Sequence, residues 1–397
     1  MQTVILAAGE GSRMHPLTDA VPKPMLPVGD RPLVGHLARD AVAAGATRLV
    51  VVVPPDDGSI TTYFGDRYHD VPVTTVEQPE QTGTADALRI ARSALDDGPV
   101  AVLNGDIRVD QAALERLYLS VPAVGSFRVD EPSQYGVLDP RSDGTVAGVI
   151  EKPTSPPSNL INAGAYTFPA DVLDNLDTID RSERGEYELT DLLERTCTTH
   201  DVRAIPFDRW LDVGRPWELL AAAEWRLEEI DPIVEGTVHP DATLLGSVVV
   251  EKGATIEAGV VIEGPAILSA GATVGPNAYV RGATAIGPGA TVGHAVEVKN
   301  SVLFENATVG HQSYVGDSIL ASDVNLGAGT NVANLRHDGK SVKTTVNGTV
   351  VSTGRRKYGA VCGPGVKTGI NTAINAGVVL GTEVTTRPGE VVMRSTV

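Results

Sequence analysis

The sequence has 397 residues and a formal net charge of −18 at pH 7, which favours two domains and argues against nucleic acid or an anionic membrane as a partner. Such an acidic excess is typical of proteins adapted to concentrated salt, where charge repulsion is screened within about 3 Å at 1 M. With two cysteines, no basic leader and no apolar run near the roughly 20 residues of a spanning helix, we expect a cytoplasmic protein without a disulfide framework or a cysteine-rich metal site.

The first half alternates short β-branched runs with longer stretches of helical periodicity. The apolar runs are residues 3–7, 49–53 and 100–103, and the helix-like stretches are residues 33–44, 85–95 and 111–119. This alternation predicts a Rossmann-like, three-layer α/β fold with a mostly parallel sheet. Because ligands of such sheets bind at the carboxyl ends of the strands, the segments that directly follow the runs are the candidates for a site.

A glycine-rich segment follows the first predicted strand. Gly9 and Gly11 let backbone N–H groups approach an anion closely, and Arg13 adds a fixed charge with a forked set of donors. Nine residues after Arg13 begins a Pro-Lys-Pro triplet, whose prolines stiffen the loop around Lys23. A glycine-rich turn alone is weak evidence, but together with both basic residues at this spacing it predicts a phosphate-binding site.

In these segments the first half resembles the sugar-1-phosphate nucleotidyltransferases, and the resemblance runs along residues 1–230. It implies nucleotide contacts at Leu6, Ala7, Ala8, Gly9, Gly11, Gln78, Gly83 and Thr84, with Gln78 and Gly83 at the edge of the base. It implies sugar-phosphate contacts at Gly105, Gly136, Glu151, Lys152 and Asn162. Residues 184–191 resemble a family segment that we interpret as structural.

The reaction implied by this resemblance is attack of a sugar phosphate on the α-phosphate of a nucleoside triphosphate, with pyrophosphate leaving. Asp106 and Asp212 match the family's two metal carboxylates and would hold Mg²⁺ between the phosphates. Arg13 and Lys23 are the expected catalytic residues, because they would clamp the triphosphate and stabilise the transition state. No general base is needed, since the attacking phosphate is already an anion.

Three residues of this half have a second interpretation or depart from the family. Asp106 also fits a helix N-cap, and Asn162 also fits ordinary turn chemistry. Many relatives carry lysine between the two glycines, where this sequence has Glu10. A carboxylate beside a triphosphate is unfavourable, so we do not expect Glu10 to bind the nucleotide.

The second half is organised by a six-residue period. A helical pattern over residues 216–230 joins the halves, and aliphatic residues then recur every six positions from Val238 to Val298. The phase slips between residues 303 and 315 and resumes at Leu320. No helix or ordinary sheet has this period, whereas six residues make one side of a triangular coil. We therefore predict a nucleotidyltransferase domain over residues 1–230 and an all-β, left-handed parallel β-helix (hexapeptide-repeat) domain over residues 231–397.

Residues 281–340 resemble, at matching spacing, the acetyltransferase half of the bifunctional N-acetylglucosamine-1-phosphate uridylyltransferase/glucosamine-1-phosphate acetyltransferase family. A lone histidine in a coil is most often structural, but the resemblance makes His311 the general base for attack of a sugar amine on acetyl-CoA. The implied contacts of the acetyl acceptor are Arg281, Lys299, Tyr314, Asn325, Asn334 and Lys340, and Ala328 is the implied contact of acetyl-CoA. Because sites of this family form between adjacent solenoids, the implied assembly is a homotrimer or a multiple of one.

The second half also departs from the bacterial members of that family. Leu335 stands where they carry tyrosine, and residues 344–358 form an extra segment that contains Arg355, Arg356 and Lys357. This basic cluster would either meet the phosphates of CoA or cover the next coil. Residues 359–375 look more like archaeal members.

These features predict a two-activity enzyme whose product is UDP-N-acetylglucosamine, made from glucosamine 1-phosphate, acetyl-CoA and UTP. One alternative is a glucose-1-phosphate thymidylyltransferase that uses dTTP and has amino-sugar acetyltransferase activity, since the single methyl that separates the two bases is worth only about 1–3 kcal/mol. Another is a nucleotidyltransferase whose β-helix serves only as a trimerising or effector-binding module.

Overall fold

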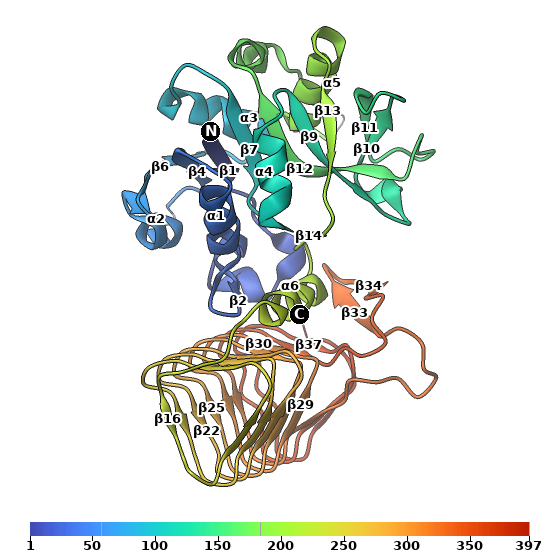
Figure 1. Cartoon of the computed structure of the whole chain (residues 1–397). Helices are drawn as coiled ribbons and strands as arrows, with labels where there is room; N and C mark the ends of the chain where they lie inside the picture. Colours follow the sequence, from blue (N-terminus) through green and yellow to red (C-terminus); the bar gives the residue numbers. More distant parts are fainter. Residues whose placement is uncertain (57, 183, 397) are drawn as a thin grey trace. The chain divides into compact units, whose positions relative to one another are not determined.

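The computed structural model describes residues 1–56, 58–182 and 184–396 (Figure 1). The chain forms two compact units, one of Met1–Glu10 with Leu33–Asp212 and the other of Gly11–Pro32 with Val213–Val397. This division differs from the predicted boundary at residue 230, because Gly11–Pro32 and the helix α6 (Pro216–Glu228) group with the second half. Within this second unit, Arg226 of α6 binds Asp30, with 2.7 Å between Nε and Oδ1. The boundary at residue 230 stays a prediction about domains.

The centre of the first unit is a parallel sheet. The strands β1 (Gln2–Leu6), β4 (Arg48–Val53), β6 (Val71–Glu77) and β7 (Val100–Asn104) run parallel in the order β7-β1-β4-β6. Val4, Val50 and Val102 are fully buried, as expected for β-branched runs with both faces covered. The short β5 (Arg67–Tyr68) closes this edge in antiparallel pairing with β6.

The other half of this sheet is antiparallel, so the expectation of a mostly parallel sheet was wrong. The strands β9 (Ala123–Arg128), β10 (Gly136–Pro140), β11 (Val146–Glu151) and β12 (Leu160–Phe168) pair antiparallel with one another, and β12 also pairs antiparallel with β7. Only β13 (Arg203–Pro206) runs parallel to its neighbour β9. The reason is the short connections between β9, β10, β11 and β12, which have no room for the crossover helix that parallel neighbours need.

Helices lie on both faces of the sheet. The three predicted stretches form α1 (Leu33–Ala43), α3 (Thr84–Ala91) and α4 (Gln111–Tyr118), and the other helices of this unit are α2 (Gly58–Phe64) and α5 (Leu189–Thr199). Thr3 bonds Tyr118 of α4, with 2.9 Å between their oxygens, while its neighbour Val4 packs in the cluster that contains Leu88 of α3. Because successive strand residues face opposite sides, α3 and α4 cover opposite faces.

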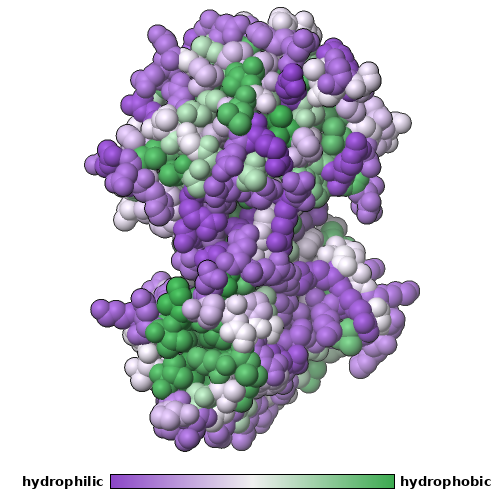
Figure 2. Space-filling model, viewed as in Figure 1, coloured by the Kyte–Doolittle hydropathy of each residue, from purple (hydrophilic) through white to green (hydrophobic). Residues whose placement is uncertain are grey.

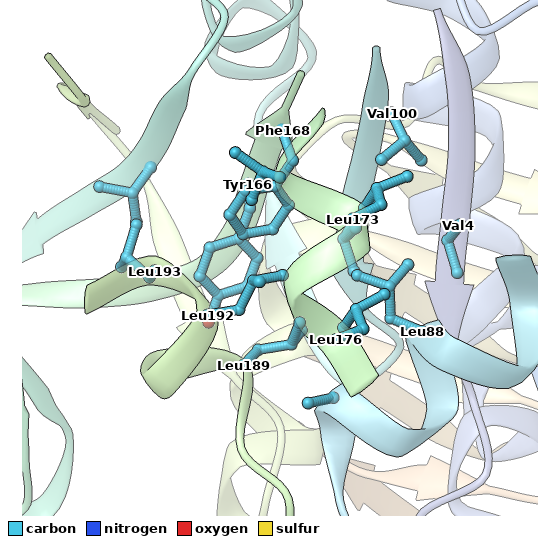
Figure 3. Packing of buried hydrophobic residues seen from close by; sticks show 14 of the residues in the cluster. Val4, Leu88, Val100, Tyr166, Phe168, Leu173, Leu176, Leu189, Leu192 and Leu193 are labelled. Carbon is cyan, nitrogen blue, oxygen red and sulfur yellow. The ribbon is translucent and has the colours of Figure 1, made fainter. Parts of the chain in front are cut away.

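The 3-10 helix η6 (Ala170–Thr178) and α5 complete the layer that contains α3. Figure 3 shows Leu173 and Leu176 of η6 and Leu189, Leu192 and Leu193 of α5 packed around Tyr166 and Phe168 of β12. The two aromatic rings are stacked, with 5.6 Å between their centroids. This core supports the sheet half that carries the sugar-binding candidates.

The second unit contains three sheets of short parallel strands, which we call the repeat region (residues 233–392). The first sheet consists of β15 (Ile233–Val234), β18 (Val248–Val250), β21 (Ala266–Leu268), β24 (Thr284–Ile286), β27 (Val302–Leu303), β30 (Ile319–Leu320), β35 (Val361–Cys362) and β37 (Val379–Leu380). The second consists of β16 (Thr237–Val238), β19 (Thr255–Ile256), β22 (Thr273–Val274), β25 (Thr291–Val292), β28 (Thr308–Val309) and β31 (Asn325–Leu326). The third consists of β17 (Thr243–Leu245), β20 (Val261–Glu263), β23 (Tyr279–Arg281), β26 (Glu297–Lys299), β29 (Tyr314–Gly316), β32 (Asn331–Val332), β36 (Ala373–Ile374) and β38 (Val391–Val392).

The register of these sheets explains the six-residue period and its slip. Val250 pairs with Leu268, 18 residues later, so three six-residue sides complete one turn of the coil. Ile286 pairs with Leu303 and Leu303 pairs with Leu320, each 17 residues later, and these two coils with one residue fewer cause the phase slip. The arrangement is consistent with a parallel β-helix.

One long insertion interrupts the repeat region. Ile319 pairs with Val361, 42 residues later, and the intervening chain contains the hairpin of β33 (Lys343–Val346) and β34 (Thr349–Ser352). The extra segment of the sequence thus leaves the coil and returns to it.

Hydrophilic residues cover most of the face seen in Figure 2, in keeping with the acidic composition. Among the described residues, no helix is long and apolar enough to cross a membrane. Cys197 and Cys362 are both buried and free.

Candidate active sites

The end of β1 and the turn after β7 pack directly on each other. Gly105 donates its backbone N–H to the carbonyl of Leu6 at 2.8 Å, and a Cβ at Gly105 would lie 2.5 Å from that oxygen. Only glycine permits this approach. Ala7 and Ala8 are buried behind the turn, whereas Gly9 and Glu10 are exposed. The structure therefore brings together the start of the glycine-rich segment and the turn that carries Asp106.

Asp106 and Asp212 occupy neighbouring positions on a small two-stranded ribbon. The strand β14 (Trp210–Asp212) runs antiparallel to β8 (Ile107–Val109), and Asp212 pairs with Ile107, which directly follows Asp106. The helix-cap alternative for Asp106 is wrong, because Asp110 caps α4 by accepting the N–H of Ala113 at 2.8 Å.

The chemistry of this ribbon fits a magnesium ion. Asn104, two residues before Asp106, has a buried side-chain oxygen that accepts no hydrogen bond from the described residues. No group of three or more histidine, cysteine or acidic side chains suited to a metal occurs in the described parts of the chain. Mg²⁺ does not require such a cage, since it usually binds one or two carboxylates and takes its remaining ligands from water and substrate phosphates.

The base-reading candidates form a tight cluster after β6. The side-chain amide of Gln78 donates to Asp86 at 2.9 Å and to the carbonyl of Gly83 at 3.2 Å. Thr84 accepts the backbone N–H of Leu189 at 3.0 Å, which joins the start of α3 to the start of α5. Gln78 is only 3% exposed, so its orientation is set by these partners.

The sugar-side candidates meet on the antiparallel half of the sheet. Gly136 pairs with Glu151, and a Cβ at Gly136 would lie 2.9 Å from Oε2 of that side chain. Burial raises the pKa of the Glu151 carboxyl, and the nearby charge of Glu188 adds to the effect, while Arg184 opposes it. Lys152 lies beside Glu151, with 3.8 Å between Nζ and Oε1.

Asn162 lies on β12 in a turn-like distortion of the strand. Its Oδ1 accepts the N–H of Gly164 at 3.0 Å and its Nδ2 donates to the hydroxyl of Tyr166 at 2.7 Å. The indole N–H of Trp210 donates to the carbonyl of Ala163 at 2.9 Å. Asn162 therefore has the turn chemistry that was its alternative interpretation, and its contact with a sugar stays a prediction.

Arg13, Lys23 and Gly11 belong to the second unit. Gly11 has φ +65°, and a Cβ there would lie 2.7 Å from Cβ of Lys23, which is 6% exposed. The guanidinium of the exposed Arg13 approaches Gly214, where a Cβ would lie 3.1 Å from Nη2. Within this unit the structure holds Lys23 against the glycine-rich turn and Arg13 against the segment that follows Asp212.

Four acetyl-acceptor candidates gather on or beside the third sheet of the repeat region. Arg281 pairs in register with Lys299 on the next strand, and Arg281 also binds Glu297 with 2.7 Å between Nη2 and Oε1. Asn334 donates to the hydroxyl of Tyr314 at 3.1 Å. Burial raises the pKa of Tyr314, and the charge of Asp317 raises it further.

Asp317 connects two of these candidates, Lys299 and Asn334, and the sequence analysis did not select it. Its buried carboxylate accepts from Lys299 Nζ at 2.7 Å, from Asn300 Nδ2 at 3.0 Å and from Asn334 Nδ2 at 2.5 Å. Its signal in the sequence was its place within residues 281–340, the segment that resembles the acetyltransferase family. Two other unselected residues are Arg184, which contacts Glu151, and Asp86, which binds Gln78.

We expect replacement of Asp317 by asparagine to lower the free energy of unfolding of the repeat region by about 1–3 kcal/mol, because an amide cannot accept from three donors at once. Calorimetric unfolding of the full chain measures the effect. Asp323→Asn is the matched control, since both aspartates have positive φ but Asp323 is exposed, and among the described residues its side chain accepts a hydrogen bond from Asn306 alone, at 3.3 Å. Equal shifts for the two variants would contradict a special role for Asp317.

His311 and Ala328 lie on stacked turns at one corner of the coil. The N–H of Gly329 donates to the carbonyl of His311 at 2.8 Å, and His311 is exposed. The backbone N–H of His294, on the preceding coil, donates to Nδ1 of His311 at 3.1 Å, which places the proton of the neutral ring on Nε2.

The remaining acetyl-site candidates are not in this cluster. Asn325 lies exposed on β31 of the second sheet, a different face of the coil from Tyr314. Lys340 is exposed in the loop after Asn334, and no contact described for it joins its side chain to Asp317. The structure thus distributes the candidate residues of one chain over two faces.

The basic cluster of the extra segment is split. Arg355 forms an ion pair with Glu224 of α6, and Nη1 lies 3.2 Å from Oε2. Glu224 also accepts from Asn300 at 2.8 Å, so Arg355 is connected to the Asp317 network. Arg356 and Lys357 remain exposed. Arg355 has a structural partner, and binding of CoA phosphates stays a prediction for the other two.

Known proteins are similar to this chain over nearly its full length. The family model described as Nucleotidyl transferase matches residues 2–229, and the model described as GMPPB C-terminal domain matches residues 262–397. A bifunctional sugar-1-phosphate nucleotidylyltransferase/acetyltransferase from Sulfurisphaera tokodaii is 37% identical over 99% of this chain and 98% of its own. A bifunctional protein GlmU from Methanococcus vannielii is 38% identical over 96% of this chain and 92% of its own.

Two further matches concern the first half. The UTP–glucose-1-phosphate uridylyltransferase AglF of Haloferax volcanii is 38% identical over 58% of this chain and 97% of its own. A crystal structure of UDP-glucose pyrophosphorylase with UDP-glucose matches 57% of this chain and 98% of its own with a TM-score of 0.53, and its 24% identity supports the fold alone.

Proposed function

Because the chain belongs to the family of bifunctional sugar-1-phosphate nucleotidylyltransferases/acetyltransferases, we propose that it acetylates glucosamine 1-phosphate and then joins the product to UMP. The products would be UDP-N-acetylglucosamine and pyrophosphate. The observation that carries this proposal is similarity to bifunctional relatives over nearly the full length of both proteins. The match of the first half to a uridylyltransferase favours UTP over dTTP.

In the first reaction, the amine of the sugar attacks the thioester carbon of acetyl-CoA. A C–N bond forms, the C–S bond breaks and CoA leaves as the thiolate, while His311 accepts the proton of the amine. Lys299 and Arg281 would bind the phosphate of the sugar, and Tyr314, Asn325 and Asn334 would bind its hydroxyl and amino groups. Lys340 would bind the sugar phosphate and Ala328 would contact CoA. Support comes from the network around Asp317, which holds Lys299 and Asn334 in one geometry.

In the second reaction, a phosphate oxygen of the acetylated sugar attacks the α-phosphate of UTP and pyrophosphate leaves. Bound Mg²⁺ would supply positive charge to the phosphates, and Asp106 and Asp212 are the residues that would hold it. Arg13 and Lys23 would bind the triphosphate and stabilise the charge that develops on pyrophosphate. The backbone of the glycine-rich segment would contact the nucleotide. The adjacent positions of the two aspartates on the β8–β14 ribbon support their shared role.

The sugar would be bound by the antiparallel half of the first sheet together with the turn after β7, which carries Gly105. Gly105, Gly136, Glu151, Lys152 and Asn162 are the proposed contacts. The pairing of Gly136 with Glu151 supports their place in one subsite, since a side chain at Gly136 would meet the carboxylate of Glu151.

We further propose that the repeat region is a left-handed β-helix and that three copies assemble with the acetyl-transfer sites between them. The 18-residue turn supports the β-helix, since it equals three hexapeptides. His311 lies at a corner of the coil, whereas Asn325 and Tyr314 lie on two different faces. This placement supports sites shared between copies, because neighbouring copies can combine residues of different faces in one pocket.

A coupled assay in high salt with Mg²⁺ tests the function. Glucosamine 1-phosphate, acetyl-CoA and equal amounts of UTP and dTTP are supplied, and free thiol, pyrophosphate and nucleotide sugars are measured. Thiol with UDP-N-acetylglucosamine as the main product is the expected result. Release of pyrophosphate without thiol would mean that the repeat region is only a trimerising or effector-binding module. A product that is mainly a dTDP-sugar would mean that the nucleotide substrate is dTTP and not UTP.

A further inference from the structure

The side chain of Gln78 is held in one orientation by two acceptors. Its partners are the carboxylate of Asp86 at 2.9 Å and the carbonyl oxygen of Gly83 at 3.2 Å. Neither partner has a hydrogen to donate, so only the NH₂ group of the Gln78 amide can form a hydrogen bond with each of them. This settles which end of the side chain is nitrogen without reference to any ligand.

The orientation leaves the amide oxygen of Gln78 available. None of the described residues donates a hydrogen bond to Oε1, although the residue as a whole is 3% exposed. Oε1 is not one of the fully buried side-chain atoms that lack a partner among the described residues, so solvent or a ligand can reach it. Gln78 therefore presents an acceptor to whatever binds beside it.

Asp86 is itself held as a charged acceptor. Burial alone would raise the pKa of its carboxyl, but hydrogen bonds from Thr82, Gln78 and Arg89 lower it. Thr82 donates to Asp86 at 2.7 Å, and Arg89 forms an ion pair with the other carboxylate oxygen. An ionised carboxylate cannot donate, so it excludes the flipped orientation of the Gln78 amide.

The second acceptor is equally fixed. Gly83 has φ +125°, and a Cβ there would lie 2.3 Å from the carbonyl of Tyr187. The same carbonyl accepts the N–H of Ala85 at 2.9 Å, and the N–H of Tyr187 donates to Thr82 at 2.8 Å. The loop that carries Gly83 is thus tied on both sides of the glycine.

We propose that Asp86 determines nucleobase specificity, because it holds the Gln78 amide with its oxygen toward the base and so selects bases whose ring nitrogen carries a hydrogen. Uracil and thymine have an N–H at ring position 3, which donates to this oxygen. Cytosine has an unprotonated nitrogen there, so acceptor would face acceptor. The inference rests on the proposed function in that Gln78 is taken to contact the base, and it assigns to Asp86 a role in choosing between base classes.

The test compares UTP, dTTP and CTP as substrates of the full-length protein and of Asp86→Asn. Asparagine keeps the shape of the side chain but can turn its own NH₂ toward Gln78, so that of the two acceptors only the carbonyl of Gly83, at 3.2 Å, still opposes a flipped glutamine amide that offers a donor to cytosine. We expect the ratio of kcat/KM for CTP to that for UTP to rise at least 10-fold, while the dTTP-to-UTP ratio stays unchanged. Thermal unfolding of the variant checks that it is folded.

Two more variants complete the design. Asp66→Asn is the matched control, since it removes the same charge from an exposed loop of the same unit and should change neither ratio. Gln78→Met leaves the bonds of Asp86 to Thr82 and Arg89 in place and should bring UTP and CTP to within a few-fold of each other, even if Asp86→Asn does not fold. An unchanged CTP-to-UTP ratio in folded Asp86→Asn, or full discrimination in Gln78→Met, would overturn the inference. If the unmodified protein releases no pyrophosphate with any of the three nucleotides, the proposed function itself has failed.

Discussion

Replacement of His311 by alanine is expected to lower the rate of acetyl transfer about 10²–10⁴-fold, the usual contribution of a general base. The amine that attacks acetyl-CoA must lose a proton as the C–N bond forms, and His311 is the proposed acceptor. Nucleotidyl transfer by the same variant, with N-acetylglucosamine 1-phosphate supplied, should be unchanged. Thiol release and pyrophosphate release, measured on one preparation, give both numbers.

His294→Ala is the matched control for this prediction. His294 lies on the preceding coil of the same corner and is also exposed, and its contact with His311 uses the backbone N–H, which alanine retains. We expect at most a small change in acetyl transfer. If both histidine variants lose the activity equally, or if His311→Ala retains it, His311 is not the base.

The second large effect is expected for Asp106→Asn, which should lower nucleotidyl transfer about 10²–10³-fold, because a metal ion contributes several kcal/mol to stabilising charge in the transition state. Acetyl transfer should be unaffected. The concentration of Mg²⁺ needed for half-maximal pyrophosphate release should rise, and this distinguishes a lost ligand from a general loss of structure. Asp212→Asn should have a similar effect. The rise in activation free energy in the double variant should not exceed the sum of the rises in the two single variants, since both residues would hold one ion.

Asp110→Ala separates this role from helix capping. Asp110 lies four residues after Asp106 and caps α4, so its loss should lower the free energy of unfolding by about 0.5–2 kcal/mol and leave the Mg²⁺ dependence unchanged. An Asp106→Asn variant with normal Mg²⁺ dependence and normal activity would contradict the metal assignment.

Much of the architecture could be read from local patterns. The helices α1, α3 and α4 and the strands β1, β4 and β7 lie within four residues of their predicted bounds, because short β-branched runs and amphipathic stretches indicate which residues are buried, whereas β6 was not predicted. The six-residue period likewise indicated the coil, since each aliphatic residue repeats the same inward position. The antiparallel half of the first sheet escaped prediction, because strand direction depends on how connections fold back and not on strand composition.

The sequence by itself determined the two halves, the coil and the family to which the site candidates belong, since these depend on spacing along the chain. Only the tertiary structure decided how the polar side chains pair. Asp317 and Asn334 meet where the chain leaves the coil for its insertion, Arg184 reaches Glu151 from 33 residues away, and Asp86 orients Gln78 across a loop. Such pairings arise because a buried charge must find hydrogen-bond partners wherever the fold supplies them, and no periodicity in the sequence records which partner is nearest.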